Sequence, residues 1–281
     1  MDSDRGTDGG VEPTPAGSDD PPLYKFGDSG PRIRSILHTL IIVVAAFVVA
    51  NVLLLVVVQV FAAAGLVPPD FESIADLAAP VAAVVFGANF VGFILVGLGY
   101  LRYRGGFSPF RTDLFDVSVP DLRDLGLTVA GLVGLFALLS VVSIVISSLG
   151  LESASNVTID LGRENPTLFL YFIGIAFLLN APAEEFLFRG IVQGLFRDAY
   201  GVVPAVLLAS ATFGVVHFLA LSGSSSGIAV TLAVTAMLGV VLGTLYELTR
   251  NLVVPTLVHG AFNAIQFLVL YLQATGAVPT A

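Results

Sequence analysis

Seven long apolar runs constrain the fold of this chain more than any other feature of its sequence. Most contain 20 or more residues, enough at about 1.5 Å per residue to cross the roughly 30 Å hydrocarbon core of a membrane. Because an unpaired backbone N–H or C=O group is so costly in lipid, runs of this length are expected to be helices. The runs are approximately 36–66, 79–101, 125–149, 168–198, 202–221, 227–248 and 251–272.

The composition excludes several classes of protein. Of the 281 residues, 56% are apolar and only 12% are charged, whereas about one quarter of a soluble domain is charged. This nearly rules out a soluble enzyme. The chain has no cysteine, which excludes disulfides, thiol catalysis and thiolate metal ligands. Its net charge of −9 argues against nucleic acid as a partner, and an acidic chain with one Lys beside eleven Arg suggests a halophilic microbe.

We therefore expect an all-α, polytopic transmembrane helix bundle of about seven to eight spans in a lipid bilayer. An eighth span requires a break in the first run or a separate interfacial helix near Pro120. Residues 1–31, rich in Asp, Gly, Pro and Ser, are expected to form a disordered acidic tail. Residues 32–166 then hold spans one to three, and residues 167–273 hold spans four to seven and the candidate chemistry.

Arginine placement predicts the orientation, because cytoplasmic loops carry an excess of Arg and Lys. Arg32 and Arg34 precede the first run, whereas the loops of the opposite parity hold only Arg163. We expect a multi-pass protein of the cell membrane with a cytoplasmic N-terminus and, with seven spans, an external C-terminus. The other arginines of the cytoplasmic set are Arg102, Arg104, Arg111, Arg123, Arg197 and Arg250.

Ionisable residues within the spans are the candidates for function, because each is expensive in a membrane unless it is paired or useful. In the fourth run, Glu185 and Arg189 are four residues apart with the acid first, the better orientation for an ion pair within one helix. Glu184 is rotated by about 100° from Glu185 and lacks that partner. Two adjacent acids with one Arg leave an uncompensated charge, which favours function over packing.

Two of the three histidines also lie deep in apolar runs, while His38 lies at the entrance of the first. Phe213 precedes His217 by one turn and is expected to pack against it. His259 and Asn263 share one face of the last run at i and i+4. Each histidine alone is more often a packing residue. In unbroken helices, however, the acid and both histidines lie at similar depths, which favours a common site.

These residue types suit two kinds of hydrolytic chemistry. A carboxylate and an imidazole around one water make a general base, while a second imidazole and an amide donate to a developing oxyanion. A glutamate and two histidines also match a catalytic zinc site with an open position, for which Glu184, His217 and His259 are the candidate ligands. The residue types do not distinguish the two.

The three motifs together resemble those of the CPBP family of intramembrane metalloproteases, which includes the type II CAAX prenyl endopeptidases and Abi-like bacterial proteins. They are Glu-Glu-x-x-x-Arg at 184–189, Phe-x-x-x-His at 213–217 and His-x-x-x-Asn at 259–263, all complete and in order. Residues 1–166 contribute only a compatible hydropathy.

The resemblance implies an intramembrane endopeptidase that hydrolyses a membrane-associated peptide or protein. It implies that Glu184 activates the water, that His217 binds the same water, and that His259 and Asn263 stabilise the oxyanion. It leaves both a zinc-dependent and a metal-free mechanism open. The alternatives from other classes are a proton-coupled transporter that uses the same groups as a relay, and an inactive membrane scaffold. Structural support is expected from Glu185, Arg189 and Phe213.

Overall fold

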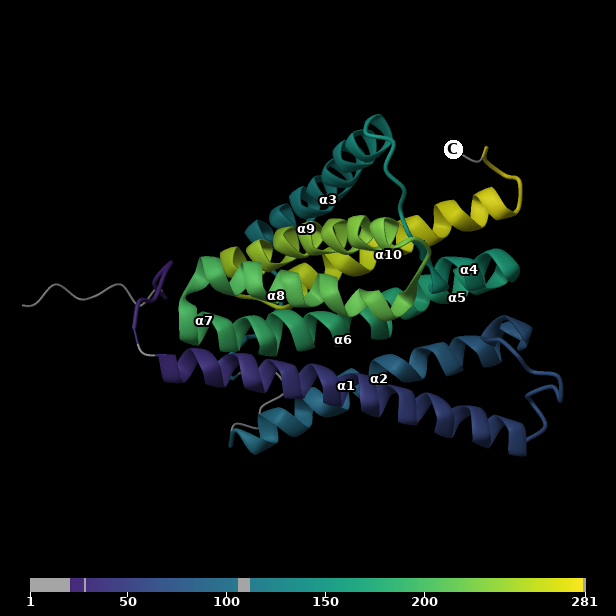
Figure 1. Cartoon of the computed structure of the whole chain (residues 1–281), viewed down its shortest axis with the longest axis horizontal. Helices are drawn as coiled ribbons and strands as arrows, with labels where there is room; N and C mark the ends of the chain where they lie inside the picture. The colour runs from purple at the N-terminus through teal and green to yellow at the C-terminus, as the bar shows by residue number, and fades with distance from the viewer. Residues whose placement is uncertain (1–20, 28, 106–111, 280–281) are drawn as a thin grey trace, which may run out of the picture.

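The computed structural model describes residues 21–27, 29–105 and 112–279, and within them it is almost entirely helical (Figure 1). Among these described residues, seven helices are long and apolar enough to cross a membrane, which confirms the expected all-α bundle and seven of its spans. The first span is one continuous helix, so it supplies no eighth. The spans are α1 (Ser29–Ala63), α2 (Ala79–Tyr103), α3 (Leu122–Ser148), a fourth over Thr167–Tyr200, a fifth over Val202–Ala220, α9 (Ser225–Thr249) and α10 (Val253–Ala274).

Two of the spans consist of several consecutive helical segments. The fourth contains α5 (Thr167–Ile175), η2 (Ala176–Asn180), α6 (Ala181–Glu185), η3 (Phe186–Gln193) and α7 (Gly194–Tyr200). The fifth contains α8 (Val202–Val216) and η4 (His217–Ala220). Short elements lie between the spans: η1 (Ile74–Asp76), α4 (Val157–Glu164), and the strands β1 (Ser155–Asn156) and β2 (Leu221–Ser222), which pair antiparallel.

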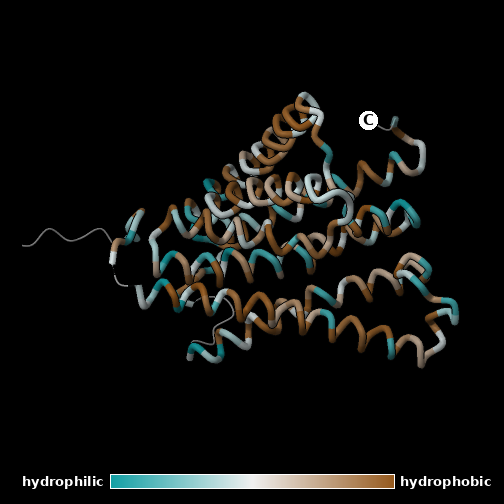
Figure 2. The backbone as a smooth tube through the Cα atoms, viewed as in Figure 1, coloured by the Kyte–Doolittle hydropathy of each residue, from teal (hydrophilic) through white to brown (hydrophobic). Residues whose placement is uncertain are grey.

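The fourth span runs through the middle of the bundle. Figure 1 shows α1 and α2 packed side by side along one flank, with α8, α9 and α10 on the other side of the fourth span and α3 leaning outward. Residues 187–193 of η3 are all buried. In Figure 2 hydrophilic segments follow the fourth span inside the bundle, whereas α3 is hydrophobic over most of its length. The polar chemistry therefore lies in the interior and the apolar surface faces outward.

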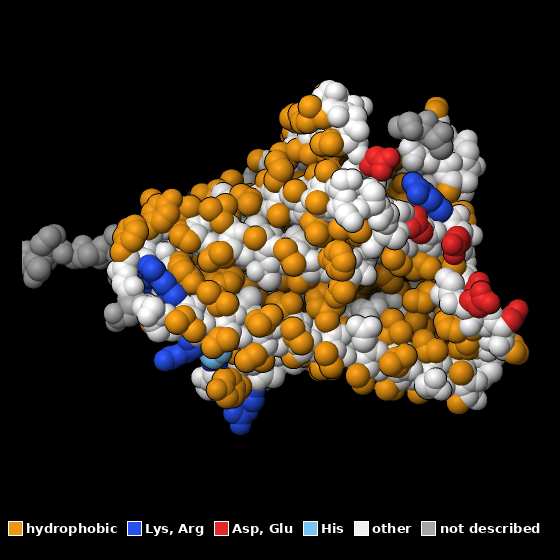
Figure 3. Space-filling model, viewed as in Figure 1, with side chains coloured by type: hydrophobic (Ala, Val, Ile, Leu, Met, Phe, Trp, Pro, Cys, Tyr) orange, Lys and Arg blue, Asp and Glu red, His pale blue; other side chains and the backbone are white. Residues whose placement is uncertain are grey.

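The two ends of the bundle differ in charge. In the view of Figure 3, Lys and Arg side chains appear mainly near the start of α1, and the Asp and Glu side chains that are visible lie at the opposite end, near α4. This distribution agrees with the arginine pattern of the sequence. The cytoplasmic location of the N-terminus stays a prediction, because no membrane defines the two sides.

Part of the expected N-terminal tail can be compared with the structure. Residues 1–20 and 28 lie outside the described residues, so disorder there stays a prediction. Residues 21–27 lie against the turn between the fourth and fifth spans, where Lys25 N–H donates to Tyr200 O at 2.8 Å and Val203 N–H donates to Leu23 O at 3.1 Å. Gly201 makes this approach possible: its φ is +90°, and a Cβ there would lie 2.7 Å from the Pro22 carbonyl oxygen.

The close packing of α1 on α2 yields a stability prediction. A Cβ on Gly92 would lie 2.6 Å from the backbone of Ala50, so Gly92→Ala must separate the two helices. We expect a loss of about 1–3 kcal/mol in the free energy of unfolding, measured in detergent. The control is Gly99→Ala in the same helix, where a Cβ meets no atom within 4 Å. Equal losses in the two variants would contradict the packing.

Candidate active site

The fourth span changes its winding on both sides of the two acids. η2 and η3 are π-helical, whereas α6 between them, which carries Glu184 and Glu185, is α-helical. Turns of this wider kind are rare and frequently occur at functional sites. They also change the rise and angular position of the residues that follow. The assumption of an unbroken α-helix in the depth comparison is therefore wrong for this span.

Glu185 is the centre of a buried ionic network. It is fully buried and its Oε1 lies 3.0 Å from Arg189 Nη1, which confirms the expected ion pair. The same Oε1 lies 2.8 Å from His259 Nδ1. Arg189 also donates to the backbone oxygen of Gly239 at 3.2 Å, so the network joins the fourth span to α9 and α10. Because a carboxylate oxygen can only accept hydrogen bonds, His259 Nδ1 carries a hydrogen and donates it to Glu185 Oε1, and Nε2 stays available to the cavity.

Glu184 belongs to a second network, a series of hydrogen bonds that runs through two amide side chains. Asn180 Nδ2 donates to Glu184 Oε1 at 2.8 Å, and Asn263 Nδ2 donates to Asn180 Oδ1 at 2.9 Å. The other carboxylate oxygen, Oε2, lies 3.8 Å from His259 Nε2. This distance is too long for a direct hydrogen bond but suits a bridging water. Glu184 and His259 are only 9% and 6% exposed, so such a water would be shielded from bulk solvent.

Phe213 connects the two histidines. Its ring lies edge-on to His217, with 4.6 Å between the centroids, and edge-on to His259 at 6.0 Å. The Arg189 guanidinium lies over the same ring at 4.4 Å. Phe213 thus packs against His217 as the sequence predicts. The His217 ring is also held by a 2.7 Å hydrogen bond between its Nδ1 and Phe213 O, which leaves Nε2 free to bind a water.

All four predicted catalytic residues line one cavity of about 750 Å³. Glu184 comes from α6, His217 from η4, and His259 and Asn263 from α10. The site is therefore assembled from three spans that are distant in sequence. Its wall combines phenylalanines with polar side chains, among them Asn51, Asn89, Asn156, Thr158, Asn180, Thr235 and Gln266.

Two features of the site were not predicted from the sequence. The first is the role of Asn180, although its position four residues before Glu184 puts both on one helix face. The second is the contact between Glu185 and His259, which are 74 residues apart. Nothing in the sequence specifies which of the two adjacent acids meets His259, because that depends on how α10 packs against the fourth span.

The positions of the three candidate zinc ligands, Glu184, His217 and His259, show whether they could hold a metal ion together. Each histidine binds the protein through Nδ1 and keeps Nε2 free, which is the usual arrangement of a metal-ligating imidazole. However, across residues 21–27, 29–105 and 112–279 no three His, Asp or Glu side chains are grouped closely enough to hold a metal ion. The grouping of Glu184, His217 and His259 therefore does not fit zinc, and zinc stays a prediction without support from the side-chain positions.

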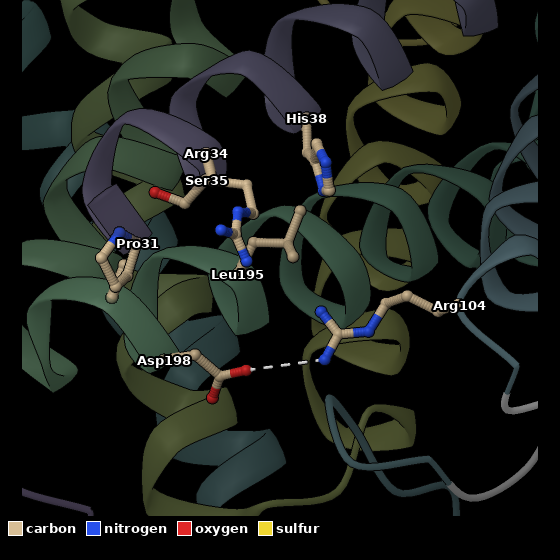
Figure 4. A pocket seen from close by; sticks show the side chains of 8 residues that line it. Pro31, Arg34, Ser35, His38, Arg104, Leu195 and Asp198 are labelled. Atoms are coloured by element: carbon tan, nitrogen blue, oxygen red, sulfur yellow. Dashed lines mark ion pairs between the residues drawn. The ribbon is translucent and has the colours of Figure 1, made fainter. Parts of the chain in front are cut away.

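A smaller cavity of about 140 Å³ lies at the arginine end of the bundle, apart from this site. Figure 4 shows Arg104 directed toward Asp198, with 3.9 Å between guanidinium and carboxylate, and His38 on the opposite wall. His38 Nδ1 lies 2.9 Å from the hydroxyl of Tyr100. His38 therefore lies at the entrance of the first span, as expected, and takes no part in the cavity around Glu184.

Comparison with known proteins identifies the segment that carries the site. Residues 166–265 match the family model described as Rce1-like, type II CAAX prenyl endopeptidase Rce1-like. The match includes all three motifs and extends from the start of the fourth span into α10. It confirms the resemblance to the CPBP family of intramembrane proteases and indicates a protease. No curated protein and no solved structure matches the chain significantly.

The buried network leads to a prediction about stability. Arg189→Met leaves the carboxylate of Glu185 without its ionic partner, and we expect a loss of about 3–5 kcal/mol in the free energy of unfolding. Glu185→Gln combined with Arg189→Met removes both charges and is expected to recover part of that loss. Unfolding in detergent measures both.

The control is an exposed ion pair whose two residues are three positions apart in one helix, close to the four positions between Glu185 and Arg189. Arg163 Nη1 lies 3.6 Å from Asp160 Oδ1, and the two side chains are 65% and 39% exposed. Arg163→Met is expected to cost less than about 1 kcal/mol. A loss as large as that of Arg189→Met would contradict the assignment of the buried network.

Proposed function

Since residues 166–265 carry the Rce1-like sequence of a membrane protease family, we propose that this protein is an intramembrane endopeptidase. It hydrolyses peptide bonds of a membrane-associated peptide or protein by means of a water activated by Glu184. The observation that carries the proposal is the 3.8 Å gap between Glu184 Oε2 and His259 Nε2 on the wall of the 750 Å³ cavity. Two groups at this separation can share one water that lies beside the line joining them.

The first chemical step is water activation. Glu184 accepts a proton from the water while the water oxygen attacks the carbonyl carbon of the scissile amide. The hydrogen bond from Asn180 to Oε1 holds the carboxylate so that Oε2 faces the water. His217, whose Nδ1 is bound to Phe213 O, offers Nε2 as an acceptor for the second hydrogen of the water.

The second step is stabilisation of the oxyanion. Asn263 uses one N–H to reach Asn180 and keeps a second for the developing negative charge. His259 donates from Nε2 when it is doubly protonated. The buried carboxylate of Glu185, 2.8 Å from Nδ1, stabilises that imidazolium. Collapse of the intermediate breaks the C–N bond, and the proton held by Glu184 passes to the leaving amine.

The substrate is proposed from the surroundings of the site. The cavity lies inside a bundle of seven candidate spans, and its wall combines aromatic rings with amides. Apolar stretches of a polypeptide bind the rings, and the backbone near the scissile bond hydrogen-bonds to the amides. A membrane-anchored peptide or protein fits this lining better than a free hydrophilic peptide.

The principal test is loss of cleavage in variants of the site. Glu184→Gln keeps the shape of the side chain but cannot accept the proton, and we expect cleavage to fall by about 10²–10⁴-fold. Asn263→Ala removes one oxyanion donor and is expected to cost about 10²–10³-fold. Cleavage is measured in liposomes by mass spectrometry of the peptide products.

Matched controls separate catalysis from folding. Glu152→Gln alters an exposed acid that does not line the cavity, and His38→Asn alters the histidine at the arginine end. Both are expected to keep wild-type activity. If wild type cleaves nothing while ion flux across the liposomes depends on Glu184 and His217, the protein is a carrier and the proposal is wrong.

Dependence on a metal is tested by the zinc content of the purified protein and by its activity after chelation. Since the three candidate ligands are not grouped for a metal, we expect purified protein to contain less than stoichiometric zinc and to keep its activity after chelation. Stoichiometric zinc in wild type, absent from both His217→Ala and His259→Ala, would overturn the metal-free mechanism.

A further inference from the structure

The catalytic cavity occupies one half of the bundle. Its lining residues fall between 47 and 54 in α1, between 86 and 93 in α2 and between 259 and 270 in α10. Toward the arginine end the lining reaches Phe93, Phe188, Leu242 and His259. None of the described residues that line it falls within 29–46, 94–134, 189–212 or 243–258, which are the segments nearer the arginine end.

The open side of the cavity is bounded by α4, which lies between two spans, and by η4, the last turn of the fifth span. The lining includes Val157 and Ile159 of α4 on one side and Leu219 of η4 on the other. Val157 and Leu219 are 46% and 67% exposed, so the lining reaches the surface there. The pairing of β1 with β2 joins the two sides of this mouth.

The other direction is closed by packed side chains. Leu187, Ile191 and Val192 of η3 are completely buried and belong to the main hydrophobic core. Arg197, only 4% exposed, donates to Leu114 O at 3.0 Å farther along the same span. A polypeptide that approached from the arginine end would have to disrupt this core before it reached Glu184.

The charges identify the side on which the mouth lies. In the described chain, the connections 64–78 and 149–166 at the mouth carry one basic residue, Arg163. Their six acids give this end a red surface in Figure 3, whereas Lys and Arg gather at the far end, which the positive-inside rule assigns to the cytoplasm. The acids are Asp70, Glu72, Asp76, Glu152, Asp160 and Glu164.

We propose that the catalytic cavity opens on the extracytoplasmic side of the membrane and receives its substrate there. The substrate class is then the extracytoplasmic stretch of a membrane-anchored polypeptide, not a cytoplasmic C-terminal segment. The cleavage step rests on the proposed function, whereas the side of entry rests on the cavity and the charge distribution alone.

Accessibility of single cysteines tests the side of entry, because the chain has no native cysteine. Gln266→Cys reports the cavity, Ser147→Cys the exposed end of α3 at the mouth side, and Ser118→Cys the exposed arginine end. The probe is a membrane-impermeant maleimide applied to intact cells and to inverted vesicles. We expect Gln266→Cys and Ser147→Cys to react in intact cells and Ser118→Cys to react only in inverted vesicles. The proposal is overturned if Gln266→Cys reacts only in the preparation in which Ser118→Cys reacts. It is also overturned if Ser118→Cys reacts in intact cells, or if Gln266→Cys reacts in neither preparation.

A cleavage measurement connects the mouth to the substrate. Leu219→Cys, modified from outside by a bulky maleimide, is expected to lose at least about tenfold in cleavage, while modified Ser147→Cys stays at wild-type level. Equal activity of both modified variants would overturn entry through this mouth. If wild type cleaves no substrate but the accessibility pattern holds, the endopeptidase function fails and the side of entry stands.

Discussion

The bundle depends on the way one buried carboxylate is neutralised. Glu185 is completely buried, and such a charge is tolerated inside a membrane protein only with a strong partner. Arg189, itself 1% exposed, supplies the charge, and His259 adds a second hydrogen bond to the same oxygen. Because His259 lies on α10, satisfying Glu185 also determines where α10 sits against the fourth span. The structural ion pair and the candidate catalytic imidazole are therefore parts of one network.

Small residues on α9 extend this network. A Cβ on Gly239 would lie 3.4 Å from Arg189 Nη2, and one on Gly243 would lie 2.7 Å from Gln193 Oε1. The carbonyl oxygens of these two glycines accept hydrogen bonds from Arg189 and Gln193. Close helix approach in a membrane depends on residues of this size. The spacing of four residues between them thus permits two polar side chains of the fourth span to be satisfied by α9.

Much of the fold is accessible from the sequence, because in lipid the length of an apolar run determines its conformation. All seven spans are predicted, and the i, i+4 pair of Glu185 and Arg189 is visible in one helix. Contacts between helices are less accessible: periodicity indicates which residues share a face but not which face meets which neighbour. The π-helical turns of η2 and η3 are a further example, since apolar residues alone do not specify a locally wider helix. Glu184, His217 and His259, which the sequence places at similar depths, nevertheless line one cavity in the structure.

The central claim is that Glu184 and His259 share one water within the bundle. A high-resolution experimental structure of the protein in lipid nanodiscs measures this most directly. The account predicts density for a single water within hydrogen-bonding distance of both Glu184 Oε2 and His259 Nε2. Side chains of Glu184 and His259 on separate surfaces, too far apart for one water to bridge, would contradict it.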